Sequence, residues 1–270
     1  MTAQPGQSYE DARARFVSLG AGVQSSAMLP MYDAGELPGP LPEAALFADT
    51  HWEPAAVYAQ LDYLERTVKR IPIHRVSAGS IRHQLLEHAA GRGRFASPPL
   101  YVFNQNAGDG RLRRQCTSEF KIEPMLAWLR AHGYGPHRPV LQLLGISADE
   151  TERAKQSRRK WAAVDWPLID AGMTRADCLA WLEAAGHPPP PKSACIGCPM
   201  RTDYGWGKLT PDERADAERV DSAIRRLPAL DSPAFLHRAR VPLAELDLRP
   251  PEERGQLSLL DGECGGACDT

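Results

Sequence analysis

Two cysteines of the segment Cys195-Ile196-Gly197-Cys198 have the type and spacing that most directly indicate chemistry. Thiolates in a C-x-x-C segment can occupy two corners of a tetrahedral metal or cluster site, or they can form a redox-active pair. Zinc and iron–sulfur clusters both bind thiolates, so the spacing alone does not separate these centres. We therefore expect a metal centre or a redox dithiol at Cys195 and Cys198.

The chain contains four other cysteines. Cys116 stands just before a predicted helix, whose N-terminal dipole and free N–H groups favour a thiolate. Cys264 and Cys268 form a C-x-x-x-C segment near the C-terminus, whereas Cys178 lies among apolar helix residues and is predicted to be core. The residues expected to supply the metal ligands are Cys116, Cys195, Cys198, Cys264 and Cys268. The main alternative is a structural zinc that connects the C-terminal tail to the rest of the chain and is bound by Cys195, Cys198, Cys264 and Cys268.

A glycine-rich turn lies between a predicted strand and a predicted helix near the start of the chain. The strand ends at Leu19, Gly20-Ala21-Gly22 forms the turn, and Ser25 and Ser26 open the helix. Free N–H groups and the positive end of the helix dipole make such a turn an anion site, and glycine lets the backbone approach a phosphate. The alternative is an ordinary turn of an α/β protein.

Two well-known phosphate loops are excluded at this turn. No lysine precedes Ser25 or Ser26, as G-x-x-x-x-G-K-[ST] would require, and Ser25 stands where G-x-G-x-x-G has its third glycine.

The elements that must position these residues alternate between strands and helices. Such alternation predicts a doubly wound parallel sheet, with the ligand crevice at the carboxyl ends of the strands. The loops after Leu19, Ala48 and Ile146 are expected to lie there. Strands are predicted over 16–19, 44–48, 71–76 and 140–146, and helices over 25–29, 53–68, 81–88, 119–132 and 174–186. The last of these helices has a capping-box-like start in Thr174-Arg175-Ala176-Asp177.

The remaining segments are less regular. Residues 91–114 are rich in glycine, proline and arginine, with an aromatic patch at Tyr101 and Phe103, and are predicted to be a functional or disordered loop. We expect a nucleotide-binding α/β domain over 15–170. A helical and loop-rich region over 171–270 would carry the C-x-x-C segment and the cysteine-containing tail.

Bulk composition restricts the class of protein. A chain of 270 residues can bury a full core. Its net charge of −2 gives no overall basic field that would recruit nucleic acid, although a local arginine patch remains open. We find no signal peptide and no apolar run of about eighteen residues, which predicts a soluble, cytoplasmic protein without a membrane partner.

The hexapeptide from Gly20 to Ser25 resembles the PP-loop of the ATP pyrophosphatases, S-G-G-x-D-S, which also follows a strand. Gly20 stands where that family has serine, and Gln24 stands where it usually has aspartate. The resemblance implies binding of a nucleotide phosphate more firmly than cleavage of ATP.

Several segments in order resemble the PP-loop sulfonucleotide reductases, which reduce phosphoadenosine or adenosine phosphosulfate, and their relatives, over roughly residues 15–205. This resemblance implies an adenine nucleotide α-hydrolase-like α/β fold with a cysteine-bearing C-terminal extension, in the iron–sulfur branch. The matching segments are the glycine turn, the turn Asp49-Thr50-His51-Trp52-Glu53-Pro54, Cys116 with Lys121-Ile122-Glu123-Pro124, the strand end from Gly145 to Arg153, and the C-x-x-C segment.

In cluster-bearing reductases a Cys-Cys pair and a later C-x-x-C hold a [4Fe–4S] cluster. Here Thr117 replaces the second cysteine of the pair. The resemblance therefore implies three ligands, Cys116, Cys195 and Cys198, with the fourth iron open or bound by Cys264 or Cys268. PP-loop base-thiolating enzymes are similar to this arrangement, because three cysteines hold a cluster whose free iron can carry sulfide.

One departure from the reductases and one match with them bear on the substrate. Ser147-Ala148 stands where the reductases carry an arginine pair that binds their anionic substrate, and Arg153 is one of several arginines that could substitute. Glu263-Cys264-Gly265, in contrast, reproduces the tripeptide whose cysteine is the nucleophile of the reductases.

The function that this resemblance implies first is ATP-dependent sulfur insertion into a nucleobase, nucleotide or small molecule, with a [4Fe–4S] cluster, ATP and Mg²⁺ as cofactors. Asp49, Lys121 and Cys264 are the predicted catalytic residues. The alternatives are a sulfonucleotide reductase with Cys264 as nucleophile, and a noncatalytic nucleotide-binding module with Zn²⁺ in place of the cluster. Expected partners are an adenine nucleotide, a sulfur donor or thiol reductant, a nucleic-acid or nucleotide acceptor, and a second copy in a homodimer. The predicted nucleotide-binding residues are Ser18, Gly20, Ala21, Gly22, Gln24, Ser25, Ser26, Asp49 and Arg153.

Overall fold

The computed structural model describes residues 14–96, 98–104, 108–228 and 230–248. The chain divides into two compact units, and each is interrupted in sequence. The first, here called the sheet unit, comprises Met1–Ala48, Ala56–Val76 and Pro124–Lys192. The second, here called the cysteine unit, comprises Asp49–Ala55, Ser77–Glu123 and Ser193–Thr270. The division into a nucleotide-binding domain over 15–170 and a C-terminal region over 171–270 stays a prediction.

The sheet unit contains five parallel strands in the order β3-β2-β1-β6-β7. Val17 at the centre pairs with Ala45 on one side and Leu143 on the other. From β1 the chain moves outward to β2 and β3, and it then returns to the other side of β1 for β6 and β7. The strands are β1 (Ala14–Leu19), β2 (Ala44–Ala48), β3 (Ile73–Val76), β6 (Val140–Leu144) and β7 (Ala162–Asp165).

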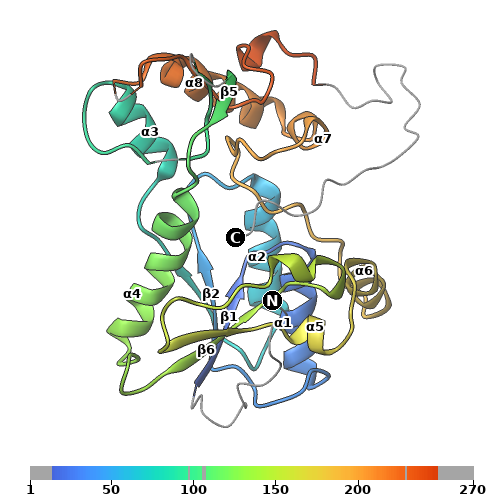
Figure 1. Ribbon diagram of the computed structural model, residues 1–270. Coiled ribbons are helices and arrows are strands. Elements are labelled where there is room, and N and C mark those ends of the chain that lie inside the picture. Colours follow the sequence, from blue (N-terminus) through green and yellow to red (C-terminus); the bar gives the residue numbers. More distant parts are fainter. Residues whose placement is uncertain (1–13, 97, 105–107, 229, 249–270) are drawn as a thin grey trace. The chain divides into compact units, whose positions relative to one another are not determined.

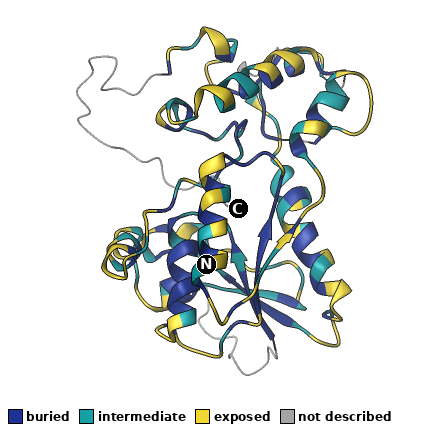
Figure 2. Ribbon diagram, turned by 180° about the vertical axis from the view of Figure 1, so that it is seen from behind, coloured by how far each residue is buried: buried dark blue, intermediate teal, exposed yellow. Residues whose placement is uncertain are grey.

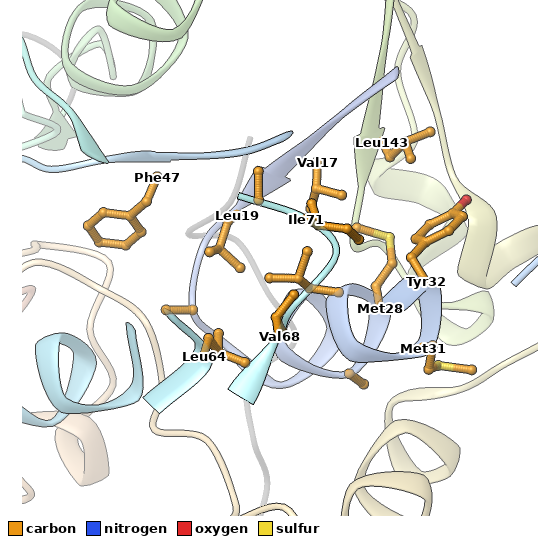
Figure 3. Packing of buried hydrophobic residues seen from close by; sticks show 14 of the residues in the cluster. Val17, Leu19, Met28, Met31, Tyr32, Phe47, Leu64, Val68, Ile71 and Leu143 are labelled. Carbon is orange, nitrogen blue, oxygen red and sulfur yellow. The ribbon is translucent and has the colours of Figure 1, made fainter. Parts of the chain in front are cut away.

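Helices cover both faces of this sheet, because successive strand residues point to opposite sides. Val17 and Leu19 pack with α1 (Val23–Ala34), α2 (Ala55–Thr67) and α6 (Arg175–Ala184) in one cluster, part of which Figure 3 shows. Phe16 packs with α4 (Glu123–Ala131) in the cluster on the other face. The predicted doubly wound α/β fold is therefore confirmed. Figure 1 shows the strands and the helices that flank them, and Figure 2 shows the burial of their residues.

Local signals fix the ends of these helices. Gly35 takes the left-handed conformation, with φ of 79°, and its N–H bonds to carbonyls of the last turn of α1. Thr174 and Asp177 form the capping box at the start of α6 that the sequence predicts. Cys178 in this helix is fully buried, as predicted, and burial is the main cause that raises its pKa to about 12.

The cysteine unit is built on a second core around Leu85, Phe120, Trp206 and Val220. Its strands form a small antiparallel sheet in the order β5-β4-β8. The elements are α3 (Ile81–Ala89), β4 (Tyr101–Asn104), β5 (Gly108–Arg111), a π-helical turn (Ser118–Ile122), α7 (Asp203–Gly207), α8 (Pro211–Ala223) and β8 (Ala234–Phe235). The short α5 (Pro167–Asp170) belongs to the sheet unit.

Strands β4 and β5 lie within the segment that the sequence predicts as an irregular loop. Each has four residues, which is too short for a clear alternating pattern. β4 also pairs with β8, more than a hundred residues later, where Tyr101 lies opposite Phe235. Such pairing between distant segments is invisible to a local reading of the sequence. Across the described ranges, no helix is both long and apolar enough to cross a membrane.

Candidate functional site

The glycine turn of the sheet unit connects β1 to α1. The Gly20 N–H donates to Ser25 Oγ over 3.2 Å, and Ser25 Oγ lies 3.3 Å from the Gly22 carbonyl oxygen. Ala21 between them has a positive φ of 55°. Gly22 caps α1 without a side-chain hydrogen bond, and the first turn of α1 holds no acidic residue. The N–H groups at this helix start are therefore not capped by a side chain, which suits an anion.

Gln24 on the first turn of α1 reaches the segment that follows β6. Its Nε2 donates to Glu150 Oε2 over 3.0 Å and lies 3.3 Å from Ser147 Oγ. Glu150 is only 9% exposed and forms an ion pair with Arg153. The structure therefore brings the predicted residues Gln24 and Arg153 together through an acid that the sequence analysis did not select.

Gly145 lets the end of β6 approach the same turn. A Cβ atom at Gly145 would lie 2.8 Å from Ser25 N and 3.0 Å from Ser25 Cα, which is closer than real Cβ contacts. Among the described residues Ser26 Oγ is buried without a hydrogen-bond partner, and Ser18 Oγ lies 3.6 Å from Met125 Sδ. The nucleotide-binding roles of these serines stay predictions.

The three cysteines Cys116, Cys195 and Cys198 line one cavity of the cysteine unit. The cavity measures about 550 Å³, counted with its opening to solvent. Lys121 and Arg114 contribute its cationic groups. The apolar part of its wall is formed by Trp52, Ile81, Leu85, Pro98, Pro99 and Phe120. Cys264 and Cys268 lie outside the described residues.

Cys195 is held by two polar side chains of the turn after β2. Its Sγ lies 3.3 Å from Thr50 Oγ1 and 3.4 Å from Glu53 Oε1, and Thr50 donates to the same Glu53 oxygen over 3.0 Å. Glu53 is 4% exposed. Burial, and then the negative charge of Glu53, raise the pKa of the Cys195 thiol well above its ordinary value. Without a metal this cysteine is a neutral thiol at neutral pH.

Cys116 has a different electrostatic environment in the same cavity. Burial raises its pKa, while the positive charges of Arg114 and Lys121 act in the opposite direction. Cys116 and Cys198 are near enough to influence each other's charge. Cys116 and Cys195, whose pKa values are raised, must each lose a proton to bind a metal as a thiolate, so metal binding would release protons.

A tryptophan supports the C-x-x-C turn. The Ile196 N–H donates to the Trp52 carbonyl over 2.7 Å, and a Cβ at Gly197 would lie within 2.8 Å of three atoms of the Trp52 ring. The ring is fixed in turn, because Trp52 Nε1 donates to Asp216 Oδ2 over 2.8 Å. Arg82 holds Asp216 through Nε and Nη2 at 2.7–3.0 Å.

The hydrogen bonds of Asp216 with Trp52 and Arg82 predict that the substitution Asp216→Asn lowers the stability of the fold. Burial alone would raise the pKa of Asp216, but hydrogen bonds from Arg82, Trp52 and Arg219 lower it from 3.8 to about 2. Because this pKa is lower in the folded chain than in the unfolded chain, the ionised Asp216 carboxylate stabilises the fold at any pH above the unfolded pKa. This stabilisation is lost as the pH falls through about 2. We expect the free energy of unfolding to fall by about 2 kcal/mol at pH 7, measured by urea denaturation.

The matched control for this prediction is Asp231→Asn, at an exposed position of the same unit. Its stability should stay close to that of the original chain. Two results would contradict this role of Asp216: an equal loss of unfolding free energy in both variants, or a lower stability of Asp216→Asn that persists near pH 2.

Asp49 forms a local turn. Its Oδ1 accepts a hydrogen bond from the His51 N–H over 2.7 Å, and its carbonyl accepts one from Ser77 Oγ over 2.8 Å. His51 has a positive φ of 54°, which is uncommon outside glycine. The predicted role of Asp49 in binding the nucleotide or Mg²⁺ stays a prediction.

Sequence reasoning missed three residues of these sites: Thr50, Glu53 and Glu150. Thr50 and Glu53 lie in the turn after β2, and Glu150 follows β6. Polar residues just after buried strands are the signal that could have identified all three, because ligands bind at these strand ends. Across the residues that the structure describes, no group of three histidine, cysteine, aspartate or glutamate side chains is arranged to hold a single metal ion.

Comparison with known proteins gives a distant structural likeness. No protein-family model matches the sequence, and no curated protein matches it. The matching solved structures include phosphoadenylyl-sulfate reductase from Candida auris, in a phosphate complex. That likeness has a TM-score of 0.44 and 13% sequence identity, over 67% of this chain and 76% of the reductase chain. The fold assignment rests on the strand order and parallel register described above.

Proposed function

We propose that the chain is a nucleotide-dependent enzyme that inserts sulfur into an acceptor, with ATP as the activating nucleotide. The observation that carries the proposal is the cavity that places three thiols beside the cations Arg114 and Lys121. A cavity with a largely apolar wall suits sulfur chemistry from which water must be excluded. Cations at the same cavity suit an acceptor or leaving group that carries phosphate.

The sheet unit would bind the nucleotide. The uncapped start of α1 offers N–H groups to phosphate oxygens, and Ser25 orders the turn through its bond with Gly20. Electrostatic stabilisation by such fixed dipoles needs no reorganisation during the reaction. The Gln24–Glu150 contact brings a carboxylate to the helix position where PP-loop enzymes have aspartate. We propose that Glu150 supplies the carboxylate that Gln24 lacks.

The three cavity thiols suit a thiolate-bound cluster by their chemistry, because thiolates are soft ligands and all three line one cavity. Cys116, Cys195 and Cys198 would hold a [4Fe–4S] cluster, which would supply sulfur-carrying chemistry when bound. Thr50 and Glu53 orient Cys195, while Arg114 and Lys121 offset negative charge near Cys116.

The proposed reaction is balanced without an external oxidant or reductant. A carbonyl oxygen of the acceptor attacks the α-phosphorus of ATP, and pyrophosphate leaves. Hydrosulfide sulfur then attacks the activated carbon, the C–O bond breaks, and AMP leaves with that oxygen. Lys121 and Arg114 would neutralise the charge of a phosphate-bearing acceptor at the three-cysteine cavity. Sulfur enters and leaves this sequence in the same oxidation state.

Product analysis tests this proposal. Anaerobically purified chain, given ATP, Mg²⁺, sulfide and a mixture of nucleosides with total RNA, should form AMP and pyrophosphate and place sulfur in the acceptor. Cys116→Ser should stop the sulfur transfer, whereas Cys178→Ser, the buried core cysteine, should not. Sulfite released from a phosphosulfate nucleotide with a thiol reductant would instead identify a sulfonucleotide reductase.

A further inference from the structure

The β4–β5 hairpin begins and ends at the wall of the three-cysteine cavity. Pro98 and Pro99, which precede β4, line that cavity, and so does Arg114, which follows β5. The Leu112 N–H donates to the Leu100 carbonyl over 2.8 Å and extends the pairing of the two strands toward the cavity. Both ends of the hairpin therefore lead directly into residues that line the cavity with its thiols and cations.

One face of the hairpin presents an aromatic ring to solvent. Val102 packs into the core, so Tyr101 and Phe103 point to the opposite face. Phe103 is 46% exposed, which makes it one of the few exposed large apolar residues described. Its ring meets the edge of Phe235, with centroids 5.7 Å apart and planes at 88°. This contact holds the Phe103 ring in place while leaving part of it open.

One arginine packs over this ring, two more lie on the neighbouring strand and just after it, and the acid Asp109 lies opposite Phe103 in the strand register. The Arg240 guanidinium lies 5.8 Å from the centre of the Phe103 ring, and its Nε donates to the Val102 carbonyl over 3.2 Å. Arg111 lies opposite Tyr101 in the strand register and is exposed, as is Arg113 two residues later. The nearby acids Asp203 and Asp221 form ion pairs with Arg238 and Arg225.

We propose that this hairpin face binds single-stranded nucleic acid, with a base stacked on Phe103 and phosphates bound by Arg111 and Arg113. Exposed aromatic rings interleaved with cations are the features that bind single strands, since every base has a π-face and every nucleotide carries a charge. The inference rests on the proposed function and narrows its acceptor. The base that receives sulfur belongs to a polynucleotide, which the hairpin holds beside the cavity.

Fluorescence anisotropy with the full chain tests this inference directly. The probes are fluorescein-labelled single-stranded RNA and DNA of mixed sequence, each with its duplex form. We expect single strands to bind more tightly than duplexes, and Phe103→Ala to weaken single-strand binding about tenfold. Phe103→Tyr keeps a ring at this position and should retain the affinity. Arg113→Gln should weaken binding for all sequences and flatten its salt dependence.

Tyr204→Ala is the matched control, because Tyr204 is 50% exposed on α7 of the same unit and belongs to neither hairpin strand. Its affinity should be unchanged, and thermal unfolding shows whether each variant is folded. A difference between the RNA and DNA probes identifies the natural strand. Absence of single-strand binding, or equal losses in Phe103→Ala and Tyr204→Ala, overturns the inference. The formation of AMP and pyrophosphate with free nucleosides would still stand in that case, so the two failures are distinguishable.

Discussion

Replacing Gly197 by alanine should destabilise the cysteine unit and remove its capacity to bind a metal centre. The added methyl group would overlap the Trp52 ring, which cannot move away because Asp216 holds its Nε1. The C-x-x-C turn must then shift, and Cys195 and Cys198 shift with it. We expect the free energy of unfolding to fall by about 3 kcal/mol, the upper end for overpacking, with loss of bound metal. Urea denaturation and metal analysis measure the two effects.

Gly135→Ala provides the control, since a Cβ at Gly135 meets no atom within 4 Å and needs no unusual backbone angle. Its stability and metal content should match those of the original chain. Normal stability and full metal content in Gly197→Ala would show that Trp52 does not fix the C-x-x-C turn.

Gly145→Ala should strongly weaken nucleotide binding. Its Cβ would press on the backbone of Ser25 and Gln24, so the first turn of α1 would have to move. Phosphate recognition depends on the N–H groups of this turn. A misplacement of about 1 Å in a positioned group can lower a reaction rate about a hundredfold, and we expect phosphate binding to be similarly sensitive. We expect ATP binding, measured by calorimetry, to weaken at least a hundredfold, while circular dichroism shows a folded chain.

Ser25→Ala separates a local effect from a folding defect in this experiment. It removes the Oγ that accepts from the Gly20 N–H without adding volume, so the chain should fold and bind ATP more weakly. Gly135→Ala again serves as the neutral control. Unchanged ATP affinity in both Gly145→Ala and Ser25→Ala would mean that the nucleotide does not bind at the glycine turn.

Much of the sheet unit could be predicted from sequence because its signals are local. The strand over 44–48 is an uninterrupted apolar run and matches β2 to the residue. The capping box at Thr174 and the core position of Cys178 are confirmed for the same reason. β7 was missed, because its four residues and partly exposed side chains give no clear periodicity.

The cysteine unit could be predicted only in part. Its segments come from three separate stretches of the chain, and neither spacing nor composition shows which stretches meet. Resemblance to known enzymes grouped Cys116 with Cys195 and Cys198, and the structure places all three around one cavity. Their role as ligands stays a prediction. Glu53 was missed, because an isolated glutamate before a helix normally indicates a solvated helix start rather than a buried partner for a thiol.

The central claim is that Cys116, Cys195 and Cys198 act as one iron–sulfur centre, and a visible absorption spectrum with iron and zinc analysis tests it most directly. Protein purified without oxygen should be brown and contain about four irons per chain at full occupancy. Serine at any one of the three positions should bleach the colour, while Cys178→Ser should leave it. Retained colour in Cys264→Ser and Cys268→Ser would indicate an open fourth iron. Stoichiometric zinc without iron, or colour that survives serine at all three positions, would contradict the claim.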